Sequence, residues 1–267
     1  MQFVSYQDGH FLSEVLLPPT TLGFTRGYAA FELLRTYNFI PFCLQEHLTR
    51  LKNSAKTLQI HYPEGLDDIV YSLIEQNPYP NILIRLYLSE DEASNKPHIL
   101  ALAGPLSIPT KEQYTYGIPI ITTSLQRQFP LVKSTSYLPA LLALKEASQK
   151  KAEDALFLSP SHHLLELTKS NFFAVFDNTL YTAPEGILLG ITRSVVIKLA
   201  KELAIPFKEA PLPYTSLPHL SEAFSTSTTR EILPISQIDS TKIPLGPITK
   251  HLHNAFSSCI IEPLSVK

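Results

Sequence analysis

The pattern of hydrophobic and polar positions predicts alternating strands and helices from the start of the chain. Residues 3–12 alternate around Asp8-Gly9, a pair that favours the two positive-φ positions of a tight turn, so the sequence predicts an opening β-hairpin. Residues 30–37, rich in apolar and aromatic side chains, predict a strand. Over residues 48–58, apolar side chains recur at spacings of three and four, which indicates an amphipathic helix that leaves Arg50 off its apolar stripe.

These periodicities continue through the first part of the chain. A second helix is expected over residues 65–76, where Asn77-Pro78 ends it. Two apolar strands follow, over residues 82–88 and 98–102. This part therefore mixes helices with antiparallel strands.

A change of pattern predicts a domain boundary near the middle of the chain. Between residues 104 and 117 prolines and polar residues replace any sustained periodicity. We expect a small N-terminal α+β domain over residues 1–106, an interdomain linker over 107–117 and a larger C-terminal domain over 118–267.

The second domain is also predicted to mix strands and helices. A strand is expected over residues 118–122, and then a helix over 138–151 that buries Leu141, Leu142 and residues 144–147. The strands expected after that helix are residues 155–158, 164–167, 172–176 and 180–182. A further helix opens at residues 190–193 and ends before Pro206. No internal repeat is visible, and the fold class is α+β in two parts.

Composition narrows the class of protein and of partner. The chain has 267 residues, of which 44% are hydrophobic and 17% charged, with a net charge of −2 and no long run of either sign. This balance argues against nucleic acid or a membrane surface as the partner and favours a small molecule. The start of the chain lacks a basic, apolar leader, and apolar runs such as residues 99–103 fall far short of the roughly 20 residues that span a bilayer, so we expect a cytoplasmic protein.

The cysteines and histidines do not predict a metal site. Cys43 and Cys259 fit a reducing compartment and are interpreted as buried thiols without a chemical role. The spacings of the histidines, His162-His163 and His251 with His253, do not place two rings on one helical face, and these residues are expected at the surface.

Any phosphate site must be built without the common glycine-rich motifs. Neither G-x-G-x-x-G nor G-x-x-x-x-G-K-[ST] occurs among the 9 glycines. The segment Gly190-Ile191-Thr192 at the head of a predicted helix is a candidate anion cradle, although Thr192 alternatively only caps the helix. Together with the hydroxyl-rich residues 225–229 and Arg50, it could hold one phosphate.

Two ionisable side chains are candidates for chemistry. Lys133 precedes a predicted helix, with Tyr137 four residues on, and is either a desolvated amine suited to a Schiff base or an ordinary solvated lysine. Glu166 lies between two apolar residues of a predicted strand, where a carboxylate faces either solvent or a buried cation.

Six segments in this order resemble the fold-type IV pyridoxal-phosphate enzymes, the family of branched-chain and D-amino-acid aminotransferases and aminodeoxychorismate lyases. The segments are residues 31–37, 47–51, 133–134, 166–173, 190–193 and 226–229, and the resemblance covers nearly the whole chain. It implies a smaller N-terminal α/β domain, a larger C-terminal pseudo-barrel domain that binds the coenzyme, pyridoxal 5′-phosphate as the cofactor, and a homodimer whose active sites use residues of both subunits.

The resemblance also implies roles for individual residues. Lys133 would form a Schiff base with the coenzyme aldehyde and then move a proton between Cα and the coenzyme carbon. Glu166 would hold the pyridine nitrogen protonated, which makes the ring an electron sink. Arg50, the amides of Ile191 and Thr192, and the Thr228 hydroxyl match phosphate ligands. The cofactor-binding residues expected are Arg50, Lys133, Tyr137, Glu166, Gly190, Ile191, Thr192, Ser227 and Thr228.

The substrate-binding residues expected from the resemblance are Arg26, Phe31, Arg85 and Thr229. Arg26 stands where the family often has a tyrosine that touches the substrate carboxylate, and it either grips that carboxylate or turns to the surface. Arg85 resembles an arginine that serves acidic substrates in branched-chain aminotransferases. An arginine seen further along that strand in D-amino-acid aminotransferases is absent, since residues 88–90 read Leu-Ser-Glu, which disfavours the D-amino-acid hypothesis.

The leading hypothesis is an aminotransferase that moves an amino group between a branched-chain or glutamate-like amino acid and a 2-oxo acid. The alternative is an aminodeoxychorismate lyase that releases pyruvate and 4-aminobenzoate with the same lysine and coenzyme. Glu32, where some lyases have a threonine, tilts the choice toward transamination. A non-catalytic binding module would be expected to have lost the lysine or the phosphate ligands, and neither is lost.

Overall fold

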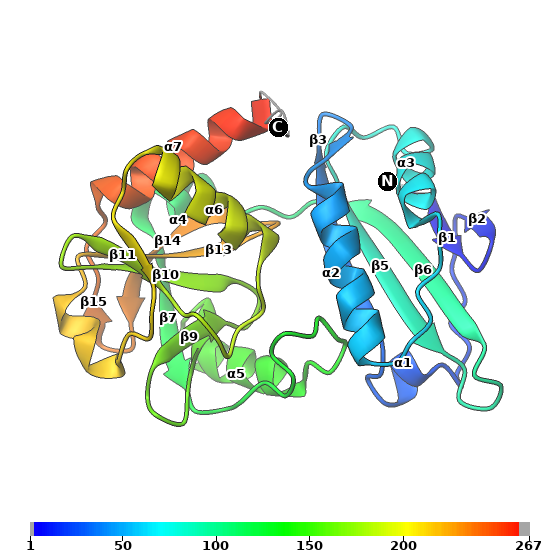
Figure 1. Ribbon diagram of the computed structural model, residues 1–267, viewed down its shortest axis with the longest axis horizontal. Coiled ribbons are helices and arrows are strands. Elements are labelled where there is room, and N and C mark those ends of the chain that lie inside the picture. The colour runs from blue at the N-terminus through cyan, green and yellow to red at the C-terminus, as the bar shows by residue number, and fades with distance from the viewer. Residues whose placement is uncertain (1–2, 262–267) are drawn as a thin grey trace. The chain divides into compact units, whose positions relative to one another are not determined.

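The computed structural model describes residues 3–261 and divides the chain into two compact units (Figure 1). Unit 1 runs up to Ser107 and includes Val132–Tyr137, whereas unit 2 comprises Ile108–Leu131 and the residues from Leu138 onward. Lys133 therefore belongs to unit 1, although the segment before it belongs to unit 2. No periodicity in the sequence indicates that the chain goes back to the first unit here. The segment expected as a linker contains the helix α4 (Lys111–Tyr116) and belongs with unit 2.

Unit 1 is built on one antiparallel sheet, with strands in the order β2-β1-β6-β5-β3-β4. Its strands are β1 (Ser5–Gln7), β2 (His10–Leu12), β3 (Ala30–Tyr37), β4 (Ile40–Pro41), β5 (Ile82–Glu90) and β6 (Pro97–Pro105). The expected opening hairpin is confirmed, because Asp8 and Gly9 both adopt positive φ between β1 and β2.

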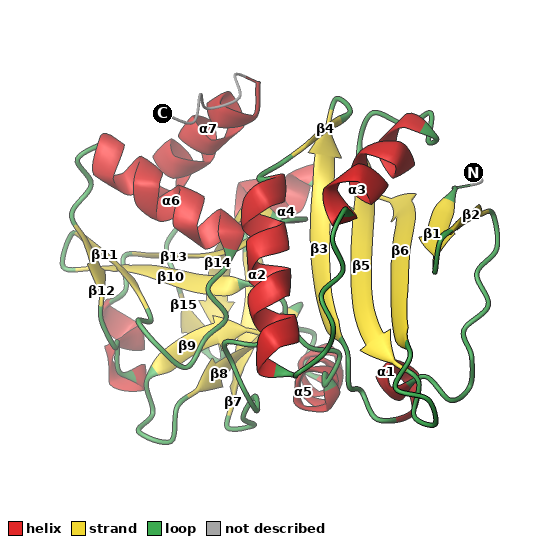
Figure 2. Ribbon diagram, turned by 45° about the vertical axis from the view of Figure 1, so that its right-hand side comes forward, coloured by secondary structure: helices red, strands yellow, loops and turns green. Residues whose placement is uncertain are grey.

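The longer helices of unit 1 cover one face of this sheet (Figure 2). They are α2 (Leu44–Thr57) and α3 (Leu66–Glu75), and a short helix α1 (Leu22–Thr25) precedes β3. Leu51 of α2 and Leu34 of β3 are fully buried in the core between helix and sheet. Side chains alternate between the faces of a strand, so Glu32 shares the helix-covered face with Leu34.

Unit 2 contains a nine-stranded sheet that closes on itself. The strand order is β12-β11-β10-β13-β14-β7-β8-β9, β15 pairs with β14, and β9 pairs again with β10. The strands are β7 (Ile118–Thr123), β8 (Asp154–Leu158), β9 (Leu164–Leu167), β10 (Asn171–Phe176), β11 (Thr179–Thr182), β12 (Phe207–Glu209), β13 (Glu222–Ser227), β14 (Glu231–Ile238) and β15 (Thr241–Lys242). The closing pair is Glu166 opposite Asn171, which gives the expected barrel-like second domain.

Four described helices pack on the strands of unit 2. The helix α6 (Ile191–Glu202) contacts β13, α7 (Pro247–Ile261) contacts β13 and β14, and α4 contacts β14. The helix α5 (Leu138–Gln149) contacts β7 and β8, and a 3-10 helix, η1 (Tyr214–His219), precedes β13. Sequence analysis did not predict α7, whose start depends on Glu222. That buried carboxylate accepts hydrogen bonds from the backbone N–H of Ile248 (3.0 Å) and Thr249 (2.7 Å).

The buried face expected for α5 is wrong. Leu141 and Leu142 are about half exposed, whereas Ala140, Ala143 and Ala147 are buried. Small side chains let the helix approach the sheet closely, so the alanine stripe and not the leucine stripe faces the strands. Cys259 is buried as expected, but Cys43 is only half-buried, at a left-handed backbone position before α2. Within the described residues, no helix is both long enough and apolar enough to cross a bilayer.

The corrected face of α5 predicts opposite outcomes for two neighbouring substitutions. Leu141→Ala removes an exposed side chain and should change the free energy of unfolding by less than about 0.5 kcal/mol. Ala143→Leu forces extra volume into the contact with the sheet and should lower it by about 1–3 kcal/mol. Urea denaturation of both variants measures the difference, and a larger loss for Leu141→Ala would place the leucines back in the core.

Candidate active site

A buried carboxylate organises the first group of candidate residues, in unit 1. Glu32 of β3 is fully buried and lies against two residues of α2. Its Oε1 accepts from Arg50 Nε at 2.7 Å, and its Oε2 accepts from Arg50 Nη2 at 2.9 Å. His47 Nδ1 lies 2.7 Å from the same Oε2. The two nitrogens of Arg50 thus form a bidentate pair, which fixes the orientation of its guanidinium plane.

The ionisation of this group follows from its burial and its partners. Burial alone would raise the pKa of Glu32, but the charge of Arg50 and the hydrogen bonds of His47 and Arg50 outweigh it and hold that pKa far below the usual range. Burial lowers the pKa of His47, against the attraction of Glu32. The imidazole is therefore neutral near pH 7 and donates its Nδ1 proton to the carboxylate.

Lys133 is held beside β3 and α2 by backbone hydrogen bonds. Its carbonyl accepts from Phe31 N at 2.9 Å, and its N–H donates to Ser54 Oγ at 3.1 Å. The Lys133 ammonium lies 4.5 Å from the centre of the Phe31 ring, which is within cation–π range. An ammonium over a ring face exchanges part of its hydration for contact with an aromatic surface, which favours the interpretation of a desolvated amine over that of an ordinary surface lysine.

Aromatic rings surround the Phe31 side chain. Tyr87 of β5 stacks on Phe31 with ring centres 5.9 Å apart, and Tyr137 meets it edge-on at 6.0 Å. Arg85, two residues before Tyr87 on the same face of β5, is half-buried. Burial raises the pKa of Tyr87, and the positive charge of Arg85 acts in the opposite direction. We call Phe31, Tyr87 and Tyr137 the aromatic wall of unit 1.

Arg26 turns to the surface, which is the second of the two orientations expected from the sequence. Its side chain is 65% exposed, and Nη2 lies 3.2 Å from Glu92 Oε1. The structure thus pairs Arg26 with a surface carboxylate of its own unit, and a surface pair of this kind contributes little to stability.

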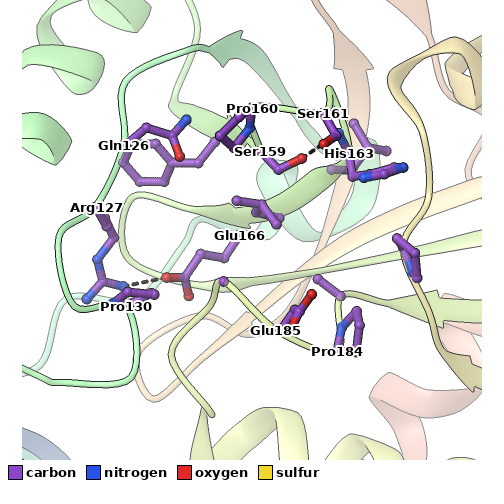
Figure 3. Close-up of a pocket in the computed structure, with 16 residues that line it drawn as sticks. Gln126, Arg127, Pro130, Ser159, Pro160, Ser161, His163, Glu166, Pro184 and Glu185 are labelled. Carbon is purple, nitrogen blue, oxygen red and sulfur yellow. Dashed lines mark hydrogen bonds and ion pairs between the residues drawn. The ribbon is translucent and has the colours of Figure 1, made fainter.

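The second group of candidate residues lies in unit 2, around Glu166 (Figure 3). Glu166 is buried, and its carboxylate forms an ion pair with Arg127. Its Oε2 accepts from Leu188 N at 3.1 Å and from Asn171 Nδ2 at 3.2 Å. Of the two orientations left open by the sequence, the structure shows the one that faces a buried cation. Arg127 was missed because nothing in the sequence around it points to a residue 39 positions away.

A cavity of about 430 Å³ adjoins Glu166 and Arg127 (Figure 3). Its other polar walls come from the turn between β8 and β9, with Ser159, Ser161 and His163, and from Glu185 after β11. Among the coenzyme residues expected in this unit, Glu166 is the one that lines the cavity. The cavity therefore lies on the Arg127 side of the carboxylate and does not include the head of α6.

The head of α6 fits an anion. The N-cap is Gly190, which makes no side-chain capping bond, so the alternative role of Thr192 as a cap does not apply. The amides of Ile191 and Thr192 belong to the first turn, which has no acceptor within the helix, and they meet the positive end of the helix dipole. A Cβ on Gly190 would lie 2.0 Å from Asn171 Oδ1, so a side chain at this position would displace the Asn171 amide.

Buried hydroxyl groups lie along the strands beside this helix head. Within residues 3–261, the hydroxyls of Ser170, Ser225 and Thr226 are buried without a hydrogen-bond partner. Thr226 pairs in the sheet with Asn171, and Ser227 and Thr228 continue the same segment. Buried polar groups without partners carry a cost that a bound polar group can offset. The residues present therefore fit a phosphate-bearing coenzyme. Across the described part of the chain, no cluster of three or more potential metal ligands occurs.

The comparison with known proteins agrees with this chemistry. The family described as amino-transferase class IV matches residues 29–238. The chain belongs to this family. A putative branched-chain-amino-acid aminotransferase of Methanocaldococcus jannaschii is 35% identical over 94% of each chain. A D-alanine aminotransferase of Listeria monocytogenes is 32% identical over 90% of this chain and 89% of its own.

The fold has close relatives among solved structures of the family. The branched-chain amino acid aminotransferase of Escherichia coli matches with a TM-score of 0.91 and 26% identity, over 97% of this chain and 95% of that one. Another branched-chain amino acid aminotransferase, solved with pyridoxamine 5′-phosphate, matches with the same TM-score and 25% identity, over 97% of this chain and 94% of its own. The chain is accordingly a pyridoxal-phosphate-dependent, two-domain aminotransferase of fold type IV. None of these findings favours the alternative of an aminodeoxychorismate lyase.

The Glu32 group predicts a pH-dependent loss of stability. Glu32→Gln leaves the Arg50 charge facing a neutral amide and should lower the free energy of unfolding at pH 7 by about 3–5 kcal/mol. Because the pKa of Glu32 is lower in the folded state than in the unfolded state, its contribution is present above about pH 4.3 and is lost as the pH falls below that value. The difference in free energy of unfolding between wild type and Glu32→Gln should therefore become smaller as the pH falls from about 5 to about 3. Urea denaturation at each pH measures this difference.

The matched control is Glu146→Gln, which removes an exposed partner of Lys150 and should leave stability nearly unchanged at every pH. The ionised state assigned to Glu32 would be contradicted if wild type and Glu32→Gln differed in free energy of unfolding by the same amount at both ends of that pH range.

Proposed function

We propose that this aminotransferase exchanges an amino group between a branched-chain or glutamate-like amino acid and a 2-oxo acid. The observation that carries the proposal is the aromatic wall of unit 1, in which Phe31 lies against Lys133 and Tyr87 lies near the cationic Arg85. Apolar ring faces suit a branched aliphatic side chain, and a guanidinium suits the distal carboxylate of glutamate. The Methanocaldococcus jannaschii relative, a putative branched-chain-amino-acid aminotransferase, supports the same substrate class.

The resemblance assigns each candidate residue a role toward pyridoxal phosphate. Pyridoxal phosphate supplies the electrophilic aldehyde and the electron-withdrawing ring. Lys133 would hold the coenzyme through its amine and would carry a proton to and from the substrate Cα, and Tyr137 would hydrogen-bond the phenolic oxygen of the coenzyme. Arg50, the Ile191 and Thr192 amides and Thr228 hold the phosphate, with Gly190 and Ser227 shaping that cradle.

Glu166 holds a proton on the pyridine nitrogen in this scheme. Its hydrogen bonds from Leu188 and Asn171 and its ion pair with Arg127 fix the carboxylate in one orientation, so little reorganisation is needed when the ring binds. Thr229 contacts the substrate. Arg26 pairs with Glu92 at the surface, so we assign it no part in binding the substrate carboxylate.

Transamination of D-alanine is a second candidate. The Listeria monocytogenes relative is a D-alanine aminotransferase that matches 90% of this chain. Against it, the position on β5 where D-amino-acid aminotransferases carry an arginine is occupied here by residues 88–90, and Ser89 is buried. The hand of the preferred amino acid therefore decides between the two candidates.

We also propose that the enzyme works as a cytoplasmic homodimer. The dimer follows from the resemblance to a family whose active sites use residues of both subunits. The cytoplasmic location rests on the composition, with two cysteines among 267 residues.

The role of Lys133 predicts a specific loss. Lys133→Ala should reduce turnover by at least about 100-fold, because the general acid–base group is gone. Borohydride reduction followed by peptide mass analysis should find the coenzyme covalently attached to the Lys133 peptide of the wild type and absent from the variant. Lys150→Ala, which changes an exposed lysine just after α5, is the control and should behave as wild type. Turnover of Lys133→Ala near the wild-type rate would refute the assignment.

The role of Arg85 predicts a change of substrate preference. Arg85→Leu should raise KM for L-glutamate by about tenfold or more, because a charge-assisted hydrogen bond to the distal carboxylate is lost, and should leave KM for L-leucine within about twofold. Single-turnover absorption of the holoenzyme with L-glutamate, L-leucine and D-alanine measures each half-reaction. Equal losses for glutamate and leucine would assign Arg85 a structural role, and a faster reaction with D-alanine would favour the second candidate.

A further inference from the structure

The turn between β13 and β14 presents two residues of the proposed site. Ser227 pairs with Glu231 across the hairpin, so the turn consists of Thr228, Thr229 and Arg230. Glu231 closes the turn with φ of 53°, a left-handed conformation that is uncommon for a residue with a side chain. A conformation of this kind persists only where the surrounding contacts hold it.

Arg230 is held through its backbone and its side chain. Its N–H donates to Ser227 Oγ at 3.3 Å, its carbonyl accepts from the Tyr114 hydroxyl at 3.1 Å, and its Nη1 donates to Asp154 Oδ2 at 2.5 Å. Tyr114 comes from α4 and Asp154 from the start of β8, so two separate elements of unit 2 hold this one turn residue.

Asp154 is a rigid anchor for the turn. Its side chain is fully buried at the start of β8, within the closed ring of strands. Its Oδ1 accepts from Ala155 N at 2.8 Å and from Thr168 Oγ1 at 2.5 Å, which leaves Oδ2 for Arg230. Thr168 follows directly after β9, the strand that carries Glu166, so one buried carboxylate joins the end of that strand to the β13–β14 turn.

We propose that Arg230 and Asp154 are positioning residues that fix the β13–β14 turn so that Thr228 reaches the coenzyme phosphate and Thr229 the substrate. This inference rests on the proposed function, which assigns those two threonines. A hydroxyl contributes to binding only when its turn already has the bound geometry, because otherwise part of the binding energy is spent on ordering the turn. An ion pair at a buried carboxylate and a hydrogen bond to the turn carbonyl supply that order in advance.

The inference predicts weaker binding of the coenzyme through its phosphate and unchanged binding through its ring. Arg230→Met should weaken binding of pyridoxal phosphate to the coenzyme-free enzyme by about tenfold or more, on the scale of misplaced binding groups. Binding of pyridoxal should change by less than about twofold, since pyridoxal has no phosphate that the Thr228 hydroxyl could contact. Titration of intrinsic protein fluorescence gives both dissociation constants, with thermal unfolding as the check on folding.

Two further variants separate positioning from stability. Arg230→Met leaves the buried Asp154 charge unpaired, which alone destabilises a protein. The double variant Asp154→Asn with Arg230→Met removes both charges, so it should regain thermal stability but not affinity for pyridoxal phosphate. Recovery of that affinity in the double variant would overturn the proposal.

A milder variant keeps the test decisive if the charged residues cannot be changed without unfolding. Tyr114→Phe removes the hydrogen bond to the Arg230 carbonyl while keeping the ring, and it should weaken pyridoxal phosphate binding by about two- to tenfold. Tyr214→Phe is its matched control, because it removes a hydroxyl bond of the same 3.1 Å length, to Asp239. Equal constants for wild type, Tyr114→Phe and Tyr214→Phe would overturn the inference alone, whereas a wild type that binds no pyridoxal phosphate would overturn the proposed function with it.

Discussion

The closure of the strand ring in unit 2 is the constraint that fixes the surroundings of Glu166 and of the head of α6. The ring closes where Glu166 of β9 pairs with Asn171 of β10, and this pairing buries the carboxylate. The Asn171 amide then donates both to Glu166 (3.2 Å) and to the Leu188 carbonyl (2.7 Å), while its oxygen occupies the space that any side chain at Gly190 would need. One amide side chain therefore fixes the position of the head of α6 relative to the Glu166 carboxylate.

Buried carboxylates paired with arginine recur in both units. Glu32, Glu166 and Asp154 lie with side-chain exposures of 0%, 4% and 0%, and each faces a guanidinium. Pairs of this kind are poor devices for stability, because desolvation of the two charges cancels most of their attraction. They do fix orientation, since a planar guanidinium held by one carboxylate keeps its remaining N–H groups in fixed directions. Their concentration around residues assigned to the coenzyme indicates that orientation, more than stability, explains why they are there.

The sequence predicted what depends on neighbours along the chain and missed what depends on distant ones. The limits of β3 and the glycine head of α6 were predicted because alternation and helix-start signals are local. Arg127 and Arg230 were missed as partners of buried carboxylates, because the ion pairs span 39 and 76 residues and no local pattern encodes them. The buried face of α5 was wrong for a related reason: hydrophobicity favours the leucines, but the closeness of the sheet, a tertiary property, selects the alanines.

The neutral state of His47 determines the net charge of the buried group near Lys133. After burial, the charge of Lys133 is one of the influences that lower the pKa of His47. Near pH 7 the imidazole carries no charge, and the single negative charge of Glu32 is matched by the single positive charge of Arg50. The group formed by Glu32, His47 and Arg50 is therefore close to electrically neutral, and the centre of the Phe31 ring lies 4.5 Å from the Lys133 ammonium. Pyridoxal phosphate would be held through the Lys133 amine, and Glu32 and Arg50 would keep each other as partners when it binds.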